Sequence, residues 1–385
     1  MPPISVLIKP ASSKCNLKCE YCFYHDVANN RSVADFGFMS LETIEVIIKK
    51  VLQFASGYAT FSFQGGEPTL CGIDFFKSIV KLQNKFNINS VRINNCLQTN
   101  GVVVDNEWAE FLHDNNFLVG LSLDGPRDIH DQYRIGAKGK GTYKRVMQTA
   151  ALFNEFEVEY NILFVVTDLT AAHPDRVYEL FKSNNFNFLQ FMPCIDPLEI
   201  ECGTHNYSLT PKRYTFFLKR FFDKWYEDLM GGREISVRYF DNLVRMAMGM
   251  SPEMCSLLGS CQCQFVFEAD GSVYPCDFYV TDEWKLGNIQ DNEILGLYNS
   301  PTCQRFIESS LAMTSSCRSC KWKSLCRGGC RRDRENPHIE KLQRNYYCES
   351  FFEFLEYAYP RLVDVARYVQ RVNLQGKEAR KSNQQ

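Results

Sequence analysis

The sequence predicts an α/β protein with a partial (β/α)6 barrel, followed by a small cysteine-rich region with a β-hairpin and by C-terminal helices. Short β-branched or apolar runs alternate with amphipathic helical stretches up to about residue 195. Such a repeat predicts parallel strands joined by right-handed crossovers. Six units are too few to close an eight-stranded barrel, so we expect an open one. From Cys255 onward the composition changes sharply, and cysteines recur at metal-ligand spacings.

Size and composition bound the class of protein. The 385 residues are 45% hydrophobic and 23% charged, with a net charge of -2, which argues against a general polyanion binder. No run of about 18 apolar residues is present, so we expect no membrane span. The N-terminal stretch lacks a charged leader and a cleavage site, and the 17 cysteines cluster at metal-ligand spacings. We therefore expect a reducing, cytoplasmic location and sensitivity to oxygen.

The barrel elements can be placed by their residue patterns. Six strands are predicted, at residues 5–10, 59–66, 91–100, 117–125, 158–167 and 186–193. Between them, helices are predicted at 41–55, with Ser40 as N-cap, and at 174–184, beginning with a proline. An aromatic-rich amphipathic helix follows at 212–230 and reads as core packing.

Polar and glycine residues follow the predicted strands at the end where barrel enzymes carry their active sites. The first strand runs into the cysteines of SKCNLKCEYCFYH, and the second ends in GGEP. The third ends in Gln98, Thr99 and Asn100, and the fourth in Ser122 and Asp124. Paired glycines let a ligand approach the backbone, although GGEP alone is equally typical of a tight turn.

Cys15, Cys19 and Cys22 have C-x3-C-x2-C spacing. Three thiolates can hold three irons of a cubane cluster and leave the fourth iron open for chemistry. On spacing alone, a zinc site or incidental core cysteines would also fit.

The second cysteine region contains a hairpin and a dense metal signature. FVFEADGSVYPC alternates apolar and polar residues around an Asp-Gly turn. The block C-x2-C-x5-C-x3-C at 317–330 fits iron-sulfur clusters, and zinc ribbons use similar spacings. The block is also basic, with cations at positions 318, 321, 323, 327, 331, 332 and 334. Such cations could offset cluster charge or face an acidic electron donor.

The triad with its aromatic Tyr21, placed one strand before GGEP, resembles the radical S-adenosylmethionine enzymes. In that family the amino and carboxylate groups of the cofactor chelate the open iron, and cluster reduction produces a 5′-deoxyadenosyl radical. The resemblance implies that the GGEP turn binds the cofactor amino group, that Ser122 and Arg134 contact ribose and carboxylate, and that the Ile195 backbone contacts adenine. The cofactor-binding residues implied are Tyr21, Gln64, Gly65, Gly66, Glu67, Ser122, Arg134 and Ile195.

The later cysteines resemble the SPASM extension of radical enzymes that modify peptides, which holds two auxiliary four-iron clusters. The resemblance implies one cluster on Cys255, Cys261, Cys276 and Cys330, and another on Cys317, Cys320, Cys326 and Cys348. Cys263 remains an alternative to Cys261. Cys71, Cys96, Cys194, Cys202 and Cys303 are left over as ordinary thiols. The expected division is a barrel at 1–230, a linker at 231–254, a SPASM domain at 255–350, and a helix with a polar tail at 351–385.

Over nearly its whole length the chain resembles the anaerobic sulfatase-maturating enzymes. This implies oxidation of a cysteine or serine in a sulfatase Cys/Ser-x-Pro/Ala-x-Arg motif to Cα-formylglycine, using S-adenosylmethionine and three [4Fe-4S] clusters. Asp277, next to Cys276, would be the base that takes the thiol or hydroxyl proton, and an auxiliary cluster would accept the second electron. A flavodoxin or ferredoxin would donate electrons to a monomeric enzyme.

Three alternatives remain open from sequence. Another SPASM-type maturase could form a thioether or carbon-carbon crosslink in a small peptide. Such enzymes often carry a recognition domain before the barrel, and the triad here begins at residue 15, so we expect none. The others are a pure electron carrier, for which the open three-cysteine site would be superfluous, and a zinc-bound scaffold or nucleic-acid protein.

Overall fold

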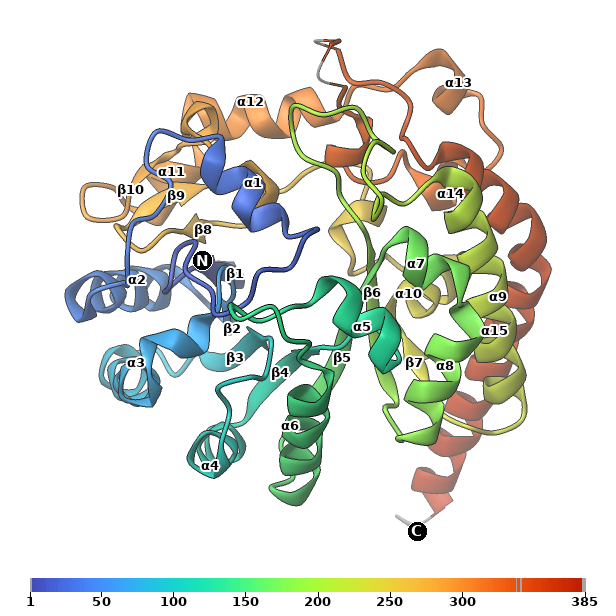
Figure 1. Cartoon of the computed structure of the whole chain (residues 1–385), viewed down its shortest axis with the longest axis horizontal. Helices are drawn as coiled ribbons and strands as arrows, with labels where there is room; N and C mark the ends of the chain where they lie inside the picture. Colours follow the sequence, from blue (N-terminus) through green and yellow to red (C-terminus); the bar gives the residue numbers. More distant parts are fainter. Residues whose placement is uncertain (1, 337, 340, 383–385) are drawn as a thin grey trace.

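The computed structural model describes residues 2–336, 338–339 and 341–382 of the chain. Its ten strands form one sheet in the order β10-β9-β8-β1-β2-β3-β4-β5-β6-β7, which curves through the middle of the molecule (Figure 1). The strands are β1 (Ile4–Ile8), β2 (Tyr58–Phe63), β3 (Arg92–Thr99), β4 (Phe117–Ser122), β5 (Tyr160–Val166), β6 (Phe188–Pro193), β7 (Ser236–Val237), β8 (Val266–Phe267), β9 (Ser272–Tyr274) and β10 (Gly287–Asn288). All six predicted barrel strands are present, as β1 to β6.

Strands β1 to β7 pair in parallel with their neighbours. The alternation of side chains along β2 shows how the barrel wall is built. Ala59, Phe61 and Phe63 are fully buried, whereas Thr60 and Ser62 between them are only partly buried. The buried side chains belong to the main hydrophobic core with those of the surrounding helices, and the other set lies on the opposite face of the strand.

Helices follow the strands and surround the sheet (Figure 1). Those of the first two thirds are α1 (Phe23–Asn29), α2 (Leu41–Phe54), α3 (Ile73–Phe86), α4 (Asn106–Asp114), α5 (Arg127–Tyr133), α6 (Tyr143–Glu155), α7 (Asp168–Ala172), α8 (Pro174–Ser183), α9 (Pro211–Met230) and α10 (Arg238–Ala247). The predicted cap is present: Ser40 Oγ accepts a hydrogen bond from Thr43 N at 3.1 Å, which satisfies one free donor at the start of α2.

The remaining elements belong to the cysteine-rich part and the C-terminus. They are α11 (Ile294–Tyr298), α12 (Pro301–Ser310), α13 (Ser315–Arg318), α14 (Lys323–Cys326) and α15 (Cys348–Ser382), with short 3-10 turns η1 (Pro68–Cys71), η2 (Cys255–Leu257), η3 (Asp277–Tyr279), η4 (Asp282–Trp284) and η5 (Arg332–Arg334). None of the helices in the described part of the chain is long and apolar enough to cross a membrane.

The aromatic stripe of α9 is core, as predicted. Phe217 and Phe221 lie against Phe191 of β6, and Phe222 packs on Phe354 of α15. Helix α15 runs alongside α9 (Figure 1) and continues through Pro360. The polar tail expected after residue 372 is therefore helical as far as residue 382, and residues 383–385 lie outside the described part.

The predicted hairpin has a position that the sequence did not indicate. Strands β8 and β9 are antiparallel around Gly271, whose φ of 83° favours glycine. Strand β8 also pairs in parallel with β1, so the cysteine-rich part extends the barrel sheet. Residues 231–254, expected to form a linker, contain β7 and α10. The domain boundaries themselves remain predictions.

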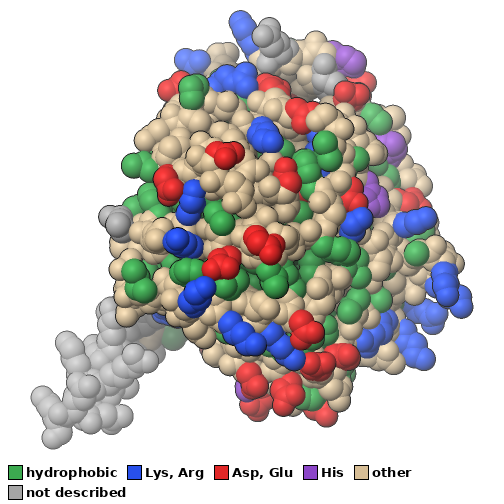
Figure 2. All heavy atoms as spheres, turned by 90° about the vertical axis from the view of Figure 1, so that its left-hand side faces the viewer, with side chains coloured by type: hydrophobic (Ala, Val, Ile, Leu, Met, Phe, Trp, Pro, Cys, Tyr) green, Lys and Arg blue, Asp and Glu red, His purple; other side chains and the backbone are tan. Residues whose placement is uncertain are grey.

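Surface charge is mixed. On the face shown in Figure 2, basic and acidic side chains are interspersed rather than gathered by sign. Several opposite charges there and elsewhere are paired, for example Lys77 with Glu107 at 2.7 Å and Lys85 with Glu45 at 3.1 Å. Exposed pairs of this kind contribute little to stability.

Candidate active site

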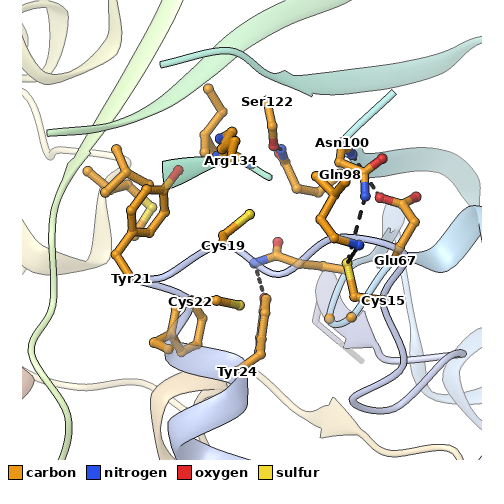
Figure 3. A pocket seen from close by; sticks show the side chains of 18 of the residues that line it. Cys15, Cys19, Tyr21, Cys22, Tyr24, Glu67, Gln98, Asn100, Ser122 and Arg134 are labelled. Carbon is orange, nitrogen blue, oxygen red and sulfur yellow. Dashed lines mark hydrogen bonds between the residues drawn. The ribbon is translucent and has the colours of Figure 1, made fainter. Parts of the chain in front are cut away.

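A cavity of about 180 Å³ opens at the C-terminal ends of the barrel strands, and all predicted cofactor-binding residues line it. The three cysteines of the triad and Asp277 line the same cavity. Figure 3 shows Cys15, Cys19 and Cys22 on one loop, facing the strand ends that carry Ser122 and Gln98. The structure therefore brings together groups that are up to 262 positions apart in the chain, since the cavity extends from Cys15 to Asp277.

The triad loop is held by contacts from neighbouring strand ends. The backbone N–H of Glu67 donates to the carbonyl of Lys14 at 2.8 Å. Asn100 Nδ2 donates to Asn16 Oδ1 at 2.8 Å and approaches Cys15 Sγ at 3.7 Å. The third cysteine, Cys22, precedes the first residue of α1. The first two contacts hold the part of the loop around Cys15 against the ends of β2 and β3.

The two glycines of GGEP are required by close packing against this loop. Gly65 and Gly66 have φ values of 89° and 55°, in the region that L side chains rarely adopt. A Cβ on Gly66 would collide with the backbone carbonyl of Lys14, and one on Gly65 would meet the side chain of Lys9. The geometry is therefore compatible both with a tight turn at GGEP and with the close approach of a ligand to its backbone.

Glu67 is a buried carboxylate that joins two strand ends. Its Oε1 accepts hydrogen bonds from Thr69 N, Thr69 Oγ1 and Thr99 Oγ1, and its Oε2 accepts one from Asn100 N at 2.7 Å. Burial raises the pKa of this carboxyl group, and the hydrogen bonds oppose that shift. Glu67 still borders the cavity, so it supports the glycine turn as well as facing a ligand.

Arg134 is buried rather than exposed, and Asp124 is the reason. Arg134 Nε donates to Asp124 Oδ2 at 2.8 Å, and the Tyr21 hydroxyl donates to the same oxygen. Asp124 Oδ1 accepts from Val165 N at 3.0 Å. Burial is the largest single influence and raises the pKa of Asp124, but the charges of Arg134 and His130 and the hydrogen bonds from Arg134 and Tyr21 together leave the pKa below its usual value. Asp124 thus orients two predicted cofactor-binding residues.

Asp277 lies in the cavity wall with one oxygen bonded and one free. Its Oδ2 accepts hydrogen bonds from the Tyr24 hydroxyl at 2.6 Å and from Gln64 Nε2 at 3.2 Å. Its buried Oδ1 accepts no hydrogen bond from the described residues, and lies 3.9 Å from Lys9 Nζ. Burial is the main influence on this carboxyl group and raises its pKa. The free oxygen is suited to accept a proton from a bound substrate.

Lys9 supports this carboxylate from behind. It is 2% exposed, and its Nζ lies 3.4 Å from Glu268 Oε1 and 4.7 Å from the centre of the Tyr24 ring. Arg31 Nη1 pairs with the same Glu268 oxygen at 2.6 Å. Because two cations surround Glu268, the charge of Lys9 also remains available to Asp277.

Burial disfavours the charged form of all three thiols of the triad. Burial raises the pKa of Cys15 to about 11 and that of Cys19 to about 12. Cluster binding must therefore displace their protons, as is usual for thiolate ligands.

A second cavity, of about 210 Å³, lies behind Asp277 and is lined by Cys255, Cys261, Cys276 and Cys330. These are the four residues that the sequence resemblance assigns to one auxiliary cluster. Gln64, Met192, Asp277 and Phe278 border this cavity as well as the first one. Asp277 therefore stands in a wall between the two.

The cysteine left open by sequence, Cys263, does not line the second cavity. A hydrogen bond between the Cys263 and Cys303 thiols raises the pKa of Cys263 and lowers that of Cys303. The geometry therefore favours Cys261 over Cys263 as a ligand.

The other predicted cysteine set also gathers in space. The pKa of Cys326 is raised to about 11, mainly by burial, with smaller contributions from the nearby thiols of Cys348, Cys317 and Cys320. The side chains come from α13, α14, the loop between these helices and the start of α15.

The donor chemistry fits iron-sulfur clusters. Four cysteines around the second cavity are the donor set of a cubane cluster. Every cysteine in the chain is a free thiol, so none is withdrawn into a disulfide.

The basic block divides into buried and exposed cations. Arg331, Arg332 and Arg334 are 8%, 7% and 5% exposed and donate to backbone carbonyls. Arg318, Lys321 and Lys323 are exposed. Arg327 is half-buried. Among the described cations of the block, the exposed group is the most accessible to an electron donor.

Sequence reasoning assigned no role to three residues of the site. Asp124 was noted only as the end of a strand, although a polar residue there was the available signal. Tyr24 and Lys9 were missed, and a lysine ending an apolar strand was the one hint of a buried charge. Their roles depend on contacts with Asp277 and Glu268, more than 200 positions away.

Comparison with known proteins gives two family matches. Residues 10–181 match the Radical SAM superfamily, and residues 259–321 match the SPASM iron-sulfur cluster-binding domain. The first covers the triad and the cavity residues at the ends of β2 to β5, and stops before β6. The second covers the hairpin and most of the later cysteines.

Relatives match over nearly the whole chain. The chain is 51% identical to a cysteine-type anaerobic sulfatase-maturating enzyme of Clostridium perfringens, covering 96% of this chain and 100% of the relative. It is 31% identical to a serine-type anaerobic sulfatase-maturating enzyme of Bacteroides thetaiotaomicron, covering 93% and 90%.

Solved structures show the same similarity. The structure of native anSMEcpe with bound AdoMet and Cp18Cys peptide superposes with a TM-score of 0.92 at 51% identity, covering 96% of this chain and 100% of that chain. The structure of Streptococcus suis SuiB bound to S-adenosylmethionine has a TM-score of 0.62 at 17% identity, covering 90% and 77%. At that identity the likeness concerns the fold alone.

Proposed function

The chain belongs to the anaerobic sulfatase-maturating enzymes, and from this premise we propose how its own residues convert a sulfatase cysteine to Cα-formylglycine. The family is one of radical S-adenosylmethionine oxidoreductases with iron-sulfur clusters. We assign the residue roles from one observation: the triad, the predicted cofactor-binding residues and Asp277 all line the same cavity.

When bound, S-adenosylmethionine and the clusters would supply a radical that removes a hydrogen atom from the substrate Cβ, and an acceptor for the second electron. Cys15, Cys19 and Cys22 would hold the cluster next to the cofactor. The glycine turn, Glu67, and the Asp124-supported Arg134 and Tyr21 would position S-adenosylmethionine. The remaining cysteines would hold the auxiliary clusters as two sets of four.

Asp277 is the proposed base. The Asp277 side chain lines the cavity, its Oδ1 accepts no hydrogen bond from the described residues, and Tyr24 and Gln64 hold Oδ2 in place. A thiol next to a Cβ that has lost a hydrogen atom must lose its proton to form a thioaldehyde, and a carboxylate oxygen within hydrogen-bond reach can take it. Water then hydrolyses the thioaldehyde to the aldehyde and hydrogen sulfide.

Apolar side chains separate this chemistry from bulk water. Leu163, Val165, Met192 and Phe278 line the cavity with the polar groups. Exclusion of water protects a reactive carbon radical from side reactions.

The preferred substrate residue is proposed to be cysteine. Identity is 51% to the cysteine-type relative and 31% to the serine-type one. A peptide crosslinking activity has less support, because SuiB resembles the chain only at the level of the fold. We further propose a monomer in a reducing compartment, served by a flavodoxin or ferredoxin that docks near the exposed cations at positions 318, 321 and 323.

The test is anaerobic incubation of the reconstituted protein, a reductant and S-adenosylmethionine with a peptide containing Cys-x-Pro-x-Arg. A peptide mass loss of about 18 Da together with 5′-deoxyadenosine is the expected result, because CH2-SH becomes CHO. A matched peptide with serine tests the substrate preference, and one with alanine should remain unchanged. Deoxyadenosine without any change in the cysteine peptide would overturn the proposal.

A further inference from the structure

Arg334 is a buried cation in the wall of the cavity formed by Cys255, Cys261, Cys276 and Cys330. Its side chain donates to the carbonyls of Ser310 at 3.0 Å and of Ala312. No ion pair of the described residues includes Arg334, although the fold pairs many other arginines with carboxylates. The guanidinium is therefore neutralised by no carboxylate in that part of the chain.

An unpaired buried cation is costly, and arginine cannot lose its charge to reduce the cost. Asp277 is the one carboxylate among the cavity residues that the structure describes, and it is engaged with Tyr24, Gln64 and Lys9. Four cysteine thiolates around a cluster would supply the missing negative charge.

Arg331 is a second cation in the same wall. Its guanidinium lies within 4.7 to 5.2 Å of the ring centres of Tyr279, Trp284 and Phe306, and its Nε pairs with Glu335 Oε1 at 2.9 Å. Glu335 balances Arg331, so Arg334 is the cation of this wall that has no carboxylate partner among the described residues.

The other cysteine set has a different electrostatic environment. Beside Cys348, the side chains of Arg344 and Glu349 pair with each other at 3.5 Å and are 52% and 72% exposed. Exposed charges are screened by water and salt, whereas buried ones are not.

We propose that Arg334, assisted by Arg331, raises the reduction potential of the cluster held by Cys255, Cys261, Cys276 and Cys330, and so makes this cluster the better electron acceptor of the two auxiliary clusters. The inference rests on the proposed function for the identity of the bound groups. A nearby positive charge stabilises the reduced, more negative cluster.

The experiment is a redox titration of the full-length reconstituted protein, followed by electron paramagnetic resonance. Cys15, Cys19 and Cys22 are replaced by alanine in every sample, so that the auxiliary clusters alone give signals. Arg334→Gln should move one of the two reduction waves to lower potential. At a fixed potential, the ratio of reduced to oxidised cluster should fall about tenfold, which for one electron corresponds to a shift of about 59 mV. Arg334→Lys keeps the positive charge, so this wave should stay close to its wild-type potential.

A matched control and an opposite change separate charge from disruption. Arg318→Gln removes an exposed guanidinium that likewise donates to a carbonyl, that of Met313, and it should leave the wave sensitive to Arg334 unmoved. Glu335→Gln removes the carboxylate beside Arg331 and should move that wave to higher potential. If Arg334→Gln lowers the iron content, its titration no longer reports on the charge alone. The shift measured in Glu335→Gln then decides whether nearby charge sets the potential of this cluster.

Waves that stay in place in both Arg334→Gln and Glu335→Gln, or that move in the same direction, would overturn the inference. The titration uses neither peptide nor S-adenosylmethionine. Failure of the inference is therefore distinguishable from failure of the proposed function, which would appear as an unmodified peptide with the wild-type protein.

Discussion

Replacing Asp277 with asparagine should separate radical formation from peptide oxidation. The two side chains have the same shape. In the wild type, the Tyr24 hydroxyl and Gln64 Nε2 lie 2.6 and 3.2 Å from Asp277 Oδ2, and the amide oxygen of asparagine can accept the same two hydrogen bonds. The amide nitrogen then takes the place of Oδ1, which has no hydrogen-bond partner among the described residues. An amide nitrogen cannot accept a proton, so the proposed base is lost while the cavity shape is kept.

The size of the effect follows from the role. Loss of a positioned base costs about 10² to 10⁴ in rate, which is about 2.7 to 5.4 kcal/mol of transition-state stabilisation. Formylglycine formation should fall by this factor. Cleavage of S-adenosylmethionine should stay within about twofold of the wild type, because Asp277 takes no part in the steps that precede hydrogen abstraction.

The assay measures both products in the same reaction, formylglycine by mass spectrometry and 5′-deoxyadenosine by chromatography. Asp282→Asn is the matched control, because Asp282 is an exposed carboxylate that bonds Ser32 N at 2.7 Å and does not line the catalytic cavity. It should leave both yields near wild type. A full yield of formylglycine from Asp277→Asn would refute the role of Asp277.

Three further predictions concern ligands and stability. Cys261→Ala should lose about one third of the bound iron, whereas Cys263→Ala should keep all of it, because three four-iron clusters are expected and Cys263 lies outside the second cavity; equal iron contents would contradict this assignment. Asp124→Asn should lower the free energy of unfolding by about 3 to 5 kcal/mol in urea titrations, because it leaves Arg134 buried without its carboxylate; a loss below about 1 kcal/mol would argue against the network. His130 is buried between Asp124 N and Thr142 Oγ1, and burial lowers its pKa from 6.5 to about 4. As the pH drops, His130 becomes protonated in the unfolded state at a higher pH than in the folded state. The free energy of unfolding should therefore fall between about pH 6.5 and about pH 4, by up to about 3 kcal/mol. His130→Gln should show a smaller decrease between pH 7 and pH 5.

The barrel strands were predictable because each signal is local. Alternating or continuous apolar runs mark strands of five to eight residues in β1 to β6, and Ser40 at the start of α2 is a local cap. The order of parallel strands then follows from short right-handed crossovers. The location of the triad, the glycine turn and Ser122 at one end of the barrel follows from the same topology.

The parts that escaped prediction depend on contacts across the chain. The pairing of β8 with β1 joins segments more than 250 residues apart, and two-residue strands such as β7 and β10 have no recognisable pattern. The choice of Cys261 over Cys263 depends on which sulfur faces the cavity, and spacing along the chain does not decide it. Burial of Arg334 within a basic block was likewise invisible, because solvated and buried arginines have the same sequence signature.

The continuity of the sheet limits how this protein can be dissected. Leu7 and Ile8 of β1 pair with Val266 and Phe267 of β8, so on one side the first barrel strand pairs with a strand that comes after Cys255. A truncated chain ending before the later cysteines would expose the backbone donors and acceptors of β1 along an apolar edge. Such edges recruit strands from other molecules, and we expect a barrel expressed alone to accumulate as insoluble aggregate.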